Sequence, residues 1–160
     1  MQYAEMAPGA VIDAGSYRVT EEEILRFATE WDPQPFHVDR DAAAQSRWGG
    51  LIASGWHTCV IAMKLAVSGV LAGSESIGSP GIDELRWEAP VRPGDELRLR
   101  LSVLSSRRSS SGEFGIVRWQ WEMTNQAGVR VLSLIATSLF GLATPAPASR
   151  GGRSHRPGGR

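Results

Sequence analysis

The chain has 160 residues, of which 42% are hydrophobic, so it has the usual size of one domain and enough apolar content for a packed core. It carries 17 basic and 17 acidic residues, but the four arginines at residues 150, 153, 156 and 160 follow the last acid, which leaves 13 basic residues against 17 acidic ones in the rest. That part has a net charge of about −4, which argues against nucleic acid or an anionic membrane as a partner.

Residues 1–6 have neither a basic cluster nor an apolar segment, so we expect no secretory signal and a cytoplasmic protein. A short strand is predicted near residues 17–19. Thr20 and Glu23 then form a capping box, in which each side chain accepts a hydrogen bond from the other residue's backbone amide. The helix should run from Thr20 to about Trp31 and end at Asp32, because a residue before proline avoids the α region.

Residues 33–39 read Pro33-Gln34-Pro35-Phe36-His37-Val38-Asp39, which predicts a loop stiffened by two prolines. Asp39 and Asp41 are then placed to cap one or two helical turns that end before Gly49-Gly50.

A second, longer helix is predicted from Ser54 as N-cap to a stop at Gly73. Its apolar residues step by three and four and extend almost round the cylinder, which is typical of a helix that other elements wrap. The lone Cys59 lies within this apolar run and is interpreted as a small buried hydrophobe in a reducing compartment. The run is too short for a membrane span, which needs roughly 20 residues.

Downstream, the hydrophobic period changes to about 2 residues. Residues 97–103 and 117–124 alternate apolar with polar side chains, which predicts half-buried antiparallel strands. Residues 82–87 and 129–140 are predicted to complete a four-strand meander. An antiparallel sheet with one apolar face can cover an apolar helix by curling round it. The predicted fold class is therefore α+β, a hot-dog arrangement in which a curved antiparallel sheet wraps a long central helix.

We expect one domain over residues 1–143, followed by a disordered tail. Residues 144–160 consist mainly of Gly, Arg, Pro, Ala and Ser, which cannot bury enough apolar surface to offset the ordering entropy. The open edges of the predicted sheet favour a homodimer or a higher homo-oligomer.

Asp32 and His37 are the leading candidates for chemistry. An anion at the C-terminal end of a helix gains nothing from the helix dipole, so a functional role for Asp32 is worth considering. A carboxylate and an imidazole five residues apart across a stiff loop could hold one water between them. Spacing alone leaves another interpretation open, in which Asp32 starts a turn and His37 bonds to the backbone.

Four segments together resemble the MaoC-like acyl dehydratases, which are similar to R-specific enoyl-CoA hydratases. The segments are Asp32-Pro33-Gln34-Pro35-Phe36-His37-Val38-Asp39, Gly49-Gly50-Leu51-Ile52-Ala53-Ser54-Gly55-Trp56-His57-Thr58, and Gly81-Ile82-Asp83-Glu84-Leu85-Arg86-Trp87 with Arg92-Pro93-Gly94-Asp95. The resemblance covers roughly residues 15–142 in matching order. It implies a hot-dog fold, a homodimer or higher assembly, and reversible hydration of a trans-2-enoyl-CoA to an (R)-3-hydroxyacyl-CoA.

Carried over residue by residue, the resemblance implies that Asp32 and His37 hold the catalytic water and that the Gly55 amide stabilises the enolate-like oxygen. Ser54, Trp56 and His57 are then candidates for contacts with the substrate. The chain departs from related hydratases in having Gln34 in the loop and Ser54 where a histidine is usual, which affects the expected acyl group. No metal or redox cofactor is implied, and coenzyme A enters as part of the substrate.

Four alternatives remain. A hydrolase based on Ser54 lacks the glycines of a nucleophile elbow, which makes the N-cap role preferable. A metal triad of His37, Asp39 and His57 has suitable ligands, but His57 belongs to the predicted helix. A hot-dog acyl-CoA thioesterase would commonly place a carboxylate on the central helix, which has none over residues 54–73. The last alternative is a non-catalytic acyl-CoA-binding subunit, against which the intact Asp32 and His37 argue.

Overall fold

The computed structural model describes residues 1–142, so the predicted disordered tail at residues 144–160 lies outside the described residues. In chain order the elements are η1 (Tyr3–Glu5), β1 (Val11–Arg18), α1 (Glu21–Trp31), α2 (Pro35–Val38), α3 (Arg40–Gln45), α4 (Gly55–Ala66), η2 (Val67–Leu71), β2 (Ser76–Trp87), β3 (Glu96–Arg108), β4 (Phe114–Thr124) and β5 (Arg130–Gly141).

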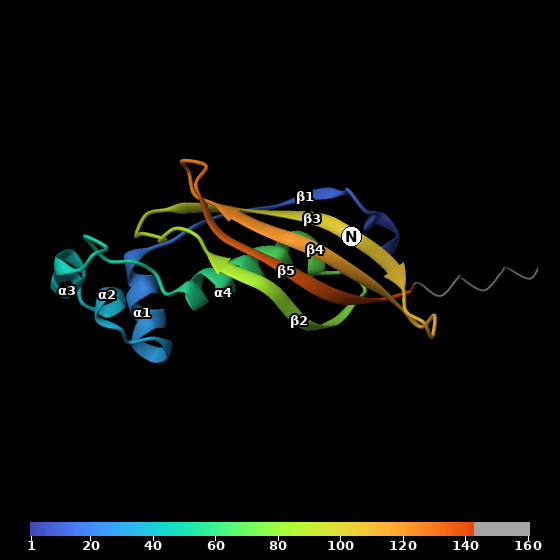
Figure 1. The fold of residues 1–160 in the computed structure, drawn as a ribbon, viewed down its shortest axis with the longest axis horizontal. Helices are drawn as coiled ribbons and strands as arrows, with labels where there is room; N and C mark the ends of the chain where they lie inside the picture. The colour runs from blue at the N-terminus through green and yellow to red at the C-terminus, as the bar shows by residue number, and fades with distance from the viewer. Residues whose placement is uncertain (143–160) are drawn as a thin grey trace, which may run out of the picture.

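The strands form one antiparallel sheet in the order β1-β3-β4-β5-β2 (Figure 1). The predicted four-strand meander was therefore wrong in one respect. The segments β3, β4 and β5 follow one another as expected, but β2 pairs with β5. The free edge of β3 is taken by β1, whose Val11 lies opposite Ser102 and whose Arg18 lies opposite Glu96.

The alternating pattern of β3 and β4 is confirmed by the burial of their side chains. Leu97, Leu99 and Leu101 are fully buried, while the arginines between them point to solvent. Across the sheet Leu99 lies opposite Met123 and Leu101 opposite Trp121, so the apolar residues of neighbouring strands share one face. This face forms the core and supports the central helix.

The central helix α4 begins at Gly55, with Ser54 as its N-cap, and continues into the π-helical turn η2. It lies along the curved sheet (Figure 1), which confirms the hot-dog arrangement. Gly69 in η2 lies so close to β1 that an added Cβ would be 2.8 Å from the Ala14 Cα. A side chain at this position would force the helix away from the strand.

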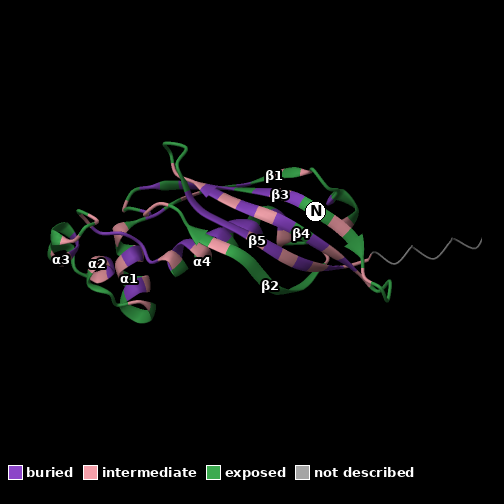
Figure 2. Cartoon of the chain, viewed as in Figure 1, coloured by how far each residue is buried: buried purple, intermediate pink, exposed green. Residues whose placement is uncertain are grey.

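The sheet covers only one side of α4, whereas the sequence predicted a helix wrapped on nearly every side. Ile61, Ala62, Leu65 and Ala66 are buried. The other side carries a stripe of exposed apolar residues at helical spacing, namely Trp56, Val60, Met63 and Val67. The neighbouring edge strand β2 is exposed along nearly its whole length (Figure 2). This uncovered face is the surface on which the predicted dimer would form, and the dimer stays a prediction.

Helices α1, α2 and α3 gather at one end of the molecule, beyond the ends of the central strands (Figure 1). The capping box of α1 is confirmed, since both reciprocal bonds between Thr20 and Glu23 are present. The loop predicted at residues 33–39 contains the single helical turn α2, with Pro35 at its start. None of the helices in residues 1–142 combines the length and apolarity needed to cross a membrane.

Candidate active site

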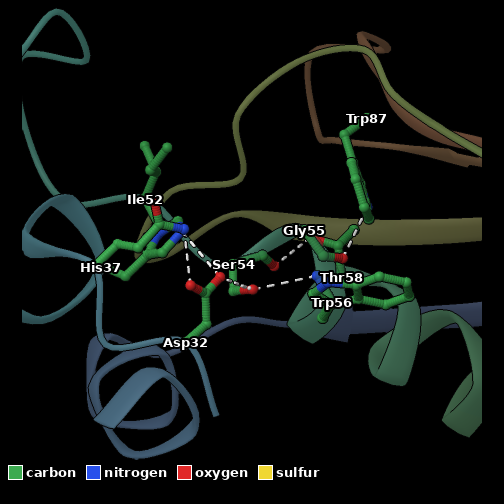
Figure 3. Close-up of polar contacts among 9 residues, drawn as sticks. Asp32, His37, Ile52, Ser54, Gly55, Trp56, Thr58 and Trp87 are labelled. Carbon is green, nitrogen blue, oxygen red and sulfur yellow. Dashed lines mark hydrogen bonds and ion pairs between the residues drawn. The ribbon is translucent and has the colours of Figure 1, made fainter.

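The Asp32 carboxylate lies between the end of α1 and the start of α4. Its backbone amide donates to the Ala28 carbonyl at 2.9 Å, and Pro33 then prevents the helix from continuing. Ser54 Oγ donates to Asp32 Oδ2 at 2.6 Å (Figure 3). Gln34 Nε2 donates to the other oxygen, Oδ1, at 2.8 Å. The carboxylate is therefore fixed in orientation by both of its oxygens.

The surroundings of Asp32 favour its ionised form. Burial raises the pKa of Asp32, but the hydrogen bonds from Ser54 and Gln34 and the nearby His37 outweigh it, and the pKa lies below its ordinary value. The C-terminal end of α1 is unfavourable to an anion, as the sequence indicated. The N-terminal end of α4, which Asp32 reaches through Ser54, has the opposite partial charge and favours one.

His37 lies in α2 and is buried, with 4% of its surface exposed. Its ring is held by two neighbours. Nδ1 lies 2.7 Å from the Ile52 carbonyl oxygen, and because a carbonyl can only accept, Nδ1 carries the proton. The Phe36 ring packs edge-on against the imidazole, with centroids 4.5 Å apart. These contacts fix both the orientation and the tautomer of His37.

Nε2 of His37 faces Asp32, at 3.4 Å from Oδ2 (Figure 3). In the neutral imidazole this nitrogen has a lone pair and no proton, because the proton is on Nδ1. A lone pair and a carboxylate oxygen are both acceptors. They can share a molecule that donates two protons, and water is the smallest such molecule. Asp32 and His37 thus lie side by side, and their expected role of holding one water stays a prediction.

The start of α4 supplies a hydrogen-bond donor beside this pair. Ser54 Oγ accepts from the Trp56 amide at 3.2 Å, which caps the helix. Within residues 1–142 the neighbouring Gly55 amide has no protein acceptor. A free amide at a helix N-terminus, where the dipole is positive, can stabilise negative charge on an oxygen.

Trp87, which the sequence did not mark as a site residue, covers Gly55. Its indole N–H donates to the Gly55 carbonyl at 2.9 Å (Figure 3). A Cβ on residue 55 would lie 2.5 Å from the Trp87 ring, so only glycine permits this contact. Gln34 was recognised only as a departure from related sequences, and its bond to Asp32 was not foreseen. Both contacts join residues whose side-chain positions depend on the whole fold.

The six predicted site residues do not share one cavity. His37 and Gly55 line a pocket of about 250 Å³ together with residues of the Ala53–Thr58 and Trp87–Val91 segments, which we name the dyad pocket. Asp32 and Ser54 are not among its lining residues. Trp56 lines a separate apolar groove of about 400 Å³ between α4 and the sheet. His57 lines a third cavity beside α1. The expected substrate contacts of Trp56 and His57 therefore stay predictions.

His57 is buried and stacks on Phe27, with ring centroids 4.7 Å apart. Its Nδ1 has no hydrogen-bond partner within the described part of the chain. Burial lowers the pKa of His57, Arg26 acts in the same direction, and Glu23 opposes them. His57 is thus a packed side chain whose neutral form is favoured by burial.

The ligands of the metal alternative are not brought together. Among residues 1–142 no group of three or more His, Cys, Asp and Glu side chains could hold a metal ion. The Asp39 carboxylate accepts from the amides of Asp41 and Ala42 and so caps α3, as predicted. Ser54, the nucleophile of the hydrolase alternative, is 1% exposed and engaged in two hydrogen bonds.

Several known proteins resemble this chain. The MaoC-like dehydratase from Rhodospirillum rubrum is 43% identical with a TM-score of 0.77, and the match covers 84% of this chain and 92% of that one. R-hydratase PhaJ1 from Pseudomonas aeruginosa is 26% identical with a TM-score of 0.68, covering 93% and 96% of the two chains. The uncharacterized protein YdeM from Bacillus subtilis is 34% identical over 131 residues, 82% of this chain and 92% of its own.

The family comparison agrees with these relatives. Residues 4–120, well over half of the chain, match the family described as the MaoC like domain. The solved relatives have the hot-dog fold seen here, and the family includes hydratases and dehydratases. Together with the paired Asp32 and His37, this match shows that the chain belongs to the MaoC-like domain family.

Proposed function

We propose that the protein adds water reversibly to trans-2-enoyl-CoA thioesters to form (R)-3-hydroxyacyl-CoA. The observation that carries this proposal is the Asp32 carboxylate, held by Ser54 and Gln34, facing His37 Nε2 at 3.4 Å. The resemblance to an R-hydratase supports the R configuration of the proposed product. A cytoplasmic homodimer, with its interface on the uncovered face of α4 and β2, is part of the proposal.

In the proposed reaction, one water donates to Asp32 and to His37 Nε2. Asp32 takes a proton from this water as the water oxygen bonds to carbon 3 of the substrate. The π electrons move to the thioester oxygen, where the Gly55 amide stabilises the enolate-like charge. The enolate then collapses, and carbon 2 receives the proton that Asp32 and His37 hold. Water is thereby added across the double bond with no metal or redox cofactor.

The experiment follows loss of the conjugated thioester after crotonyl-CoA or longer enoyl-CoA esters are mixed with purified protein. Asp32→Asn removes the base and His37→Ala removes the second water ligand, so each should lower the rate by about 10²- to 10⁴-fold. Asp39→Asn is the matched control, because it makes the same chemical change in the next segment and asparagine also caps helices well. It should keep nearly the full rate.

Two other outcomes would replace the proposal. Release of free thiol without hydration would show an acyl-CoA thioesterase. Tight binding of acyl-CoA without turnover would show a non-catalytic acyl-CoA-binding subunit. Equal rates for Asp32→Asn and Asp39→Asn would remove Asp32 from the reaction.

A further inference from the structure

Two arginines lie against Trp48 at the edge of the dyad pocket. Trp48 lines this pocket, and its ring centroid is 6.4 Å from that of Phe36, which in turn packs on His37. The Arg47 guanidinium lies over the Trp48 ring, 4.9 Å from its centroid. Arg92 Nη2 donates to the Trp48 carbonyl at 2.7 Å. Two positive charges therefore flank one residue of the pocket wall.

These two charges, which we name the arginine pair, are not neutralised by carboxylates. Other arginines within residues 1–142 form ion pairs with acids, whereas Arg47 and Arg92 form none. Both side chains are exposed. The chain before residue 150 carries a net charge of about −4, so its surface as a whole repels an anion. The arginine pair is a local positive site that can attract one to the dyad pocket.

The backbone on either side of the arginine pair is held by hydrogen bonds. The Arg92 amide donates to Asp95 Oδ2 at 2.8 Å, and Gln126 Nε2 donates to the other oxygen of this buried carboxylate at 2.9 Å. On the other segment, the Trp48 amide donates to Ser46 Oγ at 3.1 Å. Groups that are positioned before a ligand arrives lose less entropy when it binds.

A coenzyme A thioester is too large for the dyad pocket alone. Pockets that enclose drug-sized ligands have volumes of about 300–1,000 Å³, and the dyad pocket has about 250 Å³. The thioester must enter the pocket to reach His37, so most of its carrier stays outside. The phosphate groups of the carrier are anions, and a planar guanidinium can bind phosphate oxygens through two parallel hydrogen bonds. The arginine pair offers two such groups beside the pocket.

We propose that Arg47 and Arg92 bind the phosphate groups of the substrate's carrier. This inference rests on the proposed hydratase function, because it concerns the carrier of the same thioester. Neither arginine belongs to α4 or β2, so the site lies outside the proposed dimer face. The phosphate can belong to coenzyme A or to the phosphopantetheine arm of a carrier protein, and the arginine pair recognises the chemistry that the two share.

The test measures KM and kcat for three thioesters, namely crotonyl-CoA, crotonyl-4′-phosphopantetheine and crotonyl-pantetheine. Arg47→Gln and Arg92→Gln should each raise KM about tenfold for a phosphorylated ester, the low end for a hydrogen bond to a charged group. They should leave kcat nearly unchanged, because the phosphate is bound equally before and during the reaction. With crotonyl-pantetheine, which has no phosphate, KM should equal that of the wild type. Arg40→Gln is the matched control, since Arg40 already pairs with Glu21.

Two further measurements separate charge from hydrogen-bond geometry. Arg92→Lys keeps the positive charge but loses the planar fork, so it should recover only part of the affinity for the phosphorylated esters. Added salt should raise the KM for crotonyl-CoA more steeply in the wild type than in Arg47→Gln/Arg92→Gln, because salt screens the attraction between exposed charges.

The outcomes distinguish the source of the phosphate. Loss of affinity for both phosphorylated esters assigns the arginine pair to the phosphate that coenzyme A shares with the arm of a carrier protein. Loss for crotonyl-CoA alone assigns it to the phosphates of the nucleotide. An equal loss with crotonyl-pantetheine, or no loss with any of the three esters, would overturn the inference.

Equilibrium binding keeps this inference separate from the proposed function. If the wild type hydrates none of the esters, the proposed function fails, and binding of the saturated butanoyl-CoA and butanoyl-pantetheine still tests the phosphate site. Arg47→Gln and Arg92→Gln should each bind butanoyl-CoA about tenfold more weakly than the wild type does and butanoyl-pantetheine equally well. Unchanged binding of butanoyl-CoA in both variants would refute the phosphate site whatever the activity.

Discussion

Replacing Ser54 with alanine tests how the Asp32 carboxylate is held. Ser54 Oγ donates to Asp32 Oδ2 at 2.6 Å and accepts from the Trp56 amide at 3.2 Å. The substitution removes both bonds at a position that is 1% exposed, where water cannot easily replace them. It therefore affects the charge of Asp32 and the cap of α4 together.

The magnitude follows from these two bonds. A hydrogen bond to a charged group contributes about 1.5–3 kcal/mol to stability, and loss of a serine N-cap costs about 1 kcal/mol. The free energy of unfolding should fall by about 2.5–4 kcal/mol at neutral pH. Thr20→Ala is the control, because Thr20 caps α1 in the same way through the Glu23 amide but does not contact Asp32. It should lose about 1 kcal/mol, because its other bond, from Thr20 Oγ1 to the Glu23 carboxylate, is exposed to solvent and contributes little.

The effect on catalysis is measured by the pH dependence of kcat/KM. The reaction needs ionised Asp32, so the rate falls as the pH drops through the pKa of this residue. The Ser54 bond is one of the contacts that hold the pKa of Asp32 below its ordinary value, so in Ser54→Ala the acid limb should move to higher pH. Thr20→Ala should leave the limb in place. An unmoved limb in Ser54→Ala, or an equal movement in both variants, would refute the reasoning.

Three further predictions follow from other contacts. Gly55→Ala should lose most activity and some stability, because its Cβ would lie 2.5 Å from the Trp87 ring. Partial recovery of activity in Gly55→Ala/Trp87→Leu would confirm this cause, and normal activity in Gly55→Ala would contradict it. Val60→Arg, on the exposed stripe of α4, should turn a dimer into a monomer in sedimentation experiments, whereas an unchanged mass would place the interface elsewhere. The pKa of His57 is lowered in the folded protein, so its contribution to the free energy of unfolding is present above about pH 6.5 and is lost as the pH falls through the folded-state pKa. His57→Leu should flatten this part of the dependence of the free energy of unfolding on pH, measured by urea denaturation. An equally steep dependence in the variant would exclude His57 as its source.

Features that depend on neighbouring residues could be predicted from the sequence. The capping box of Thr20 and Glu23 needs only their spacing and the apolar run that follows, and both bonds are present. The alternation from Leu97 to Val103 predicted which face of β3 is buried, because successive side chains of a strand point to opposite sides. The short helix α2 was missed because four residues are too few to show a helical period.

Contacts between distant segments could not be predicted in this way. The sequence of β2 is compatible with pairing to β3 or to β5, and the position of β1 on the edge of β3 decides between them. Asp32 and Ser54 are 22 residues apart, and Trp87 and Gly55 are 32 apart. Their hydrogen bonds depend on how α1, α4 and β2 meet, which no local pattern encodes. The sequence therefore indicated which residues are candidates for the chemistry, but not the contacts that hold them in place.

The most direct measurement follows the oxygen of isotopically labelled water during incubation of crotonyl-CoA with the wild type and with Asp32→Asn. If Asp32 and His37 hold the attacking water, the label should appear in the 3-hydroxyl group of an R-configured 3-hydroxybutanoyl-CoA with the wild type. It should be almost absent from the product with Asp32→Asn. Label in a free carboxylate together with released coenzyme A, or equal labelling by both proteins, would contradict the proposed reaction.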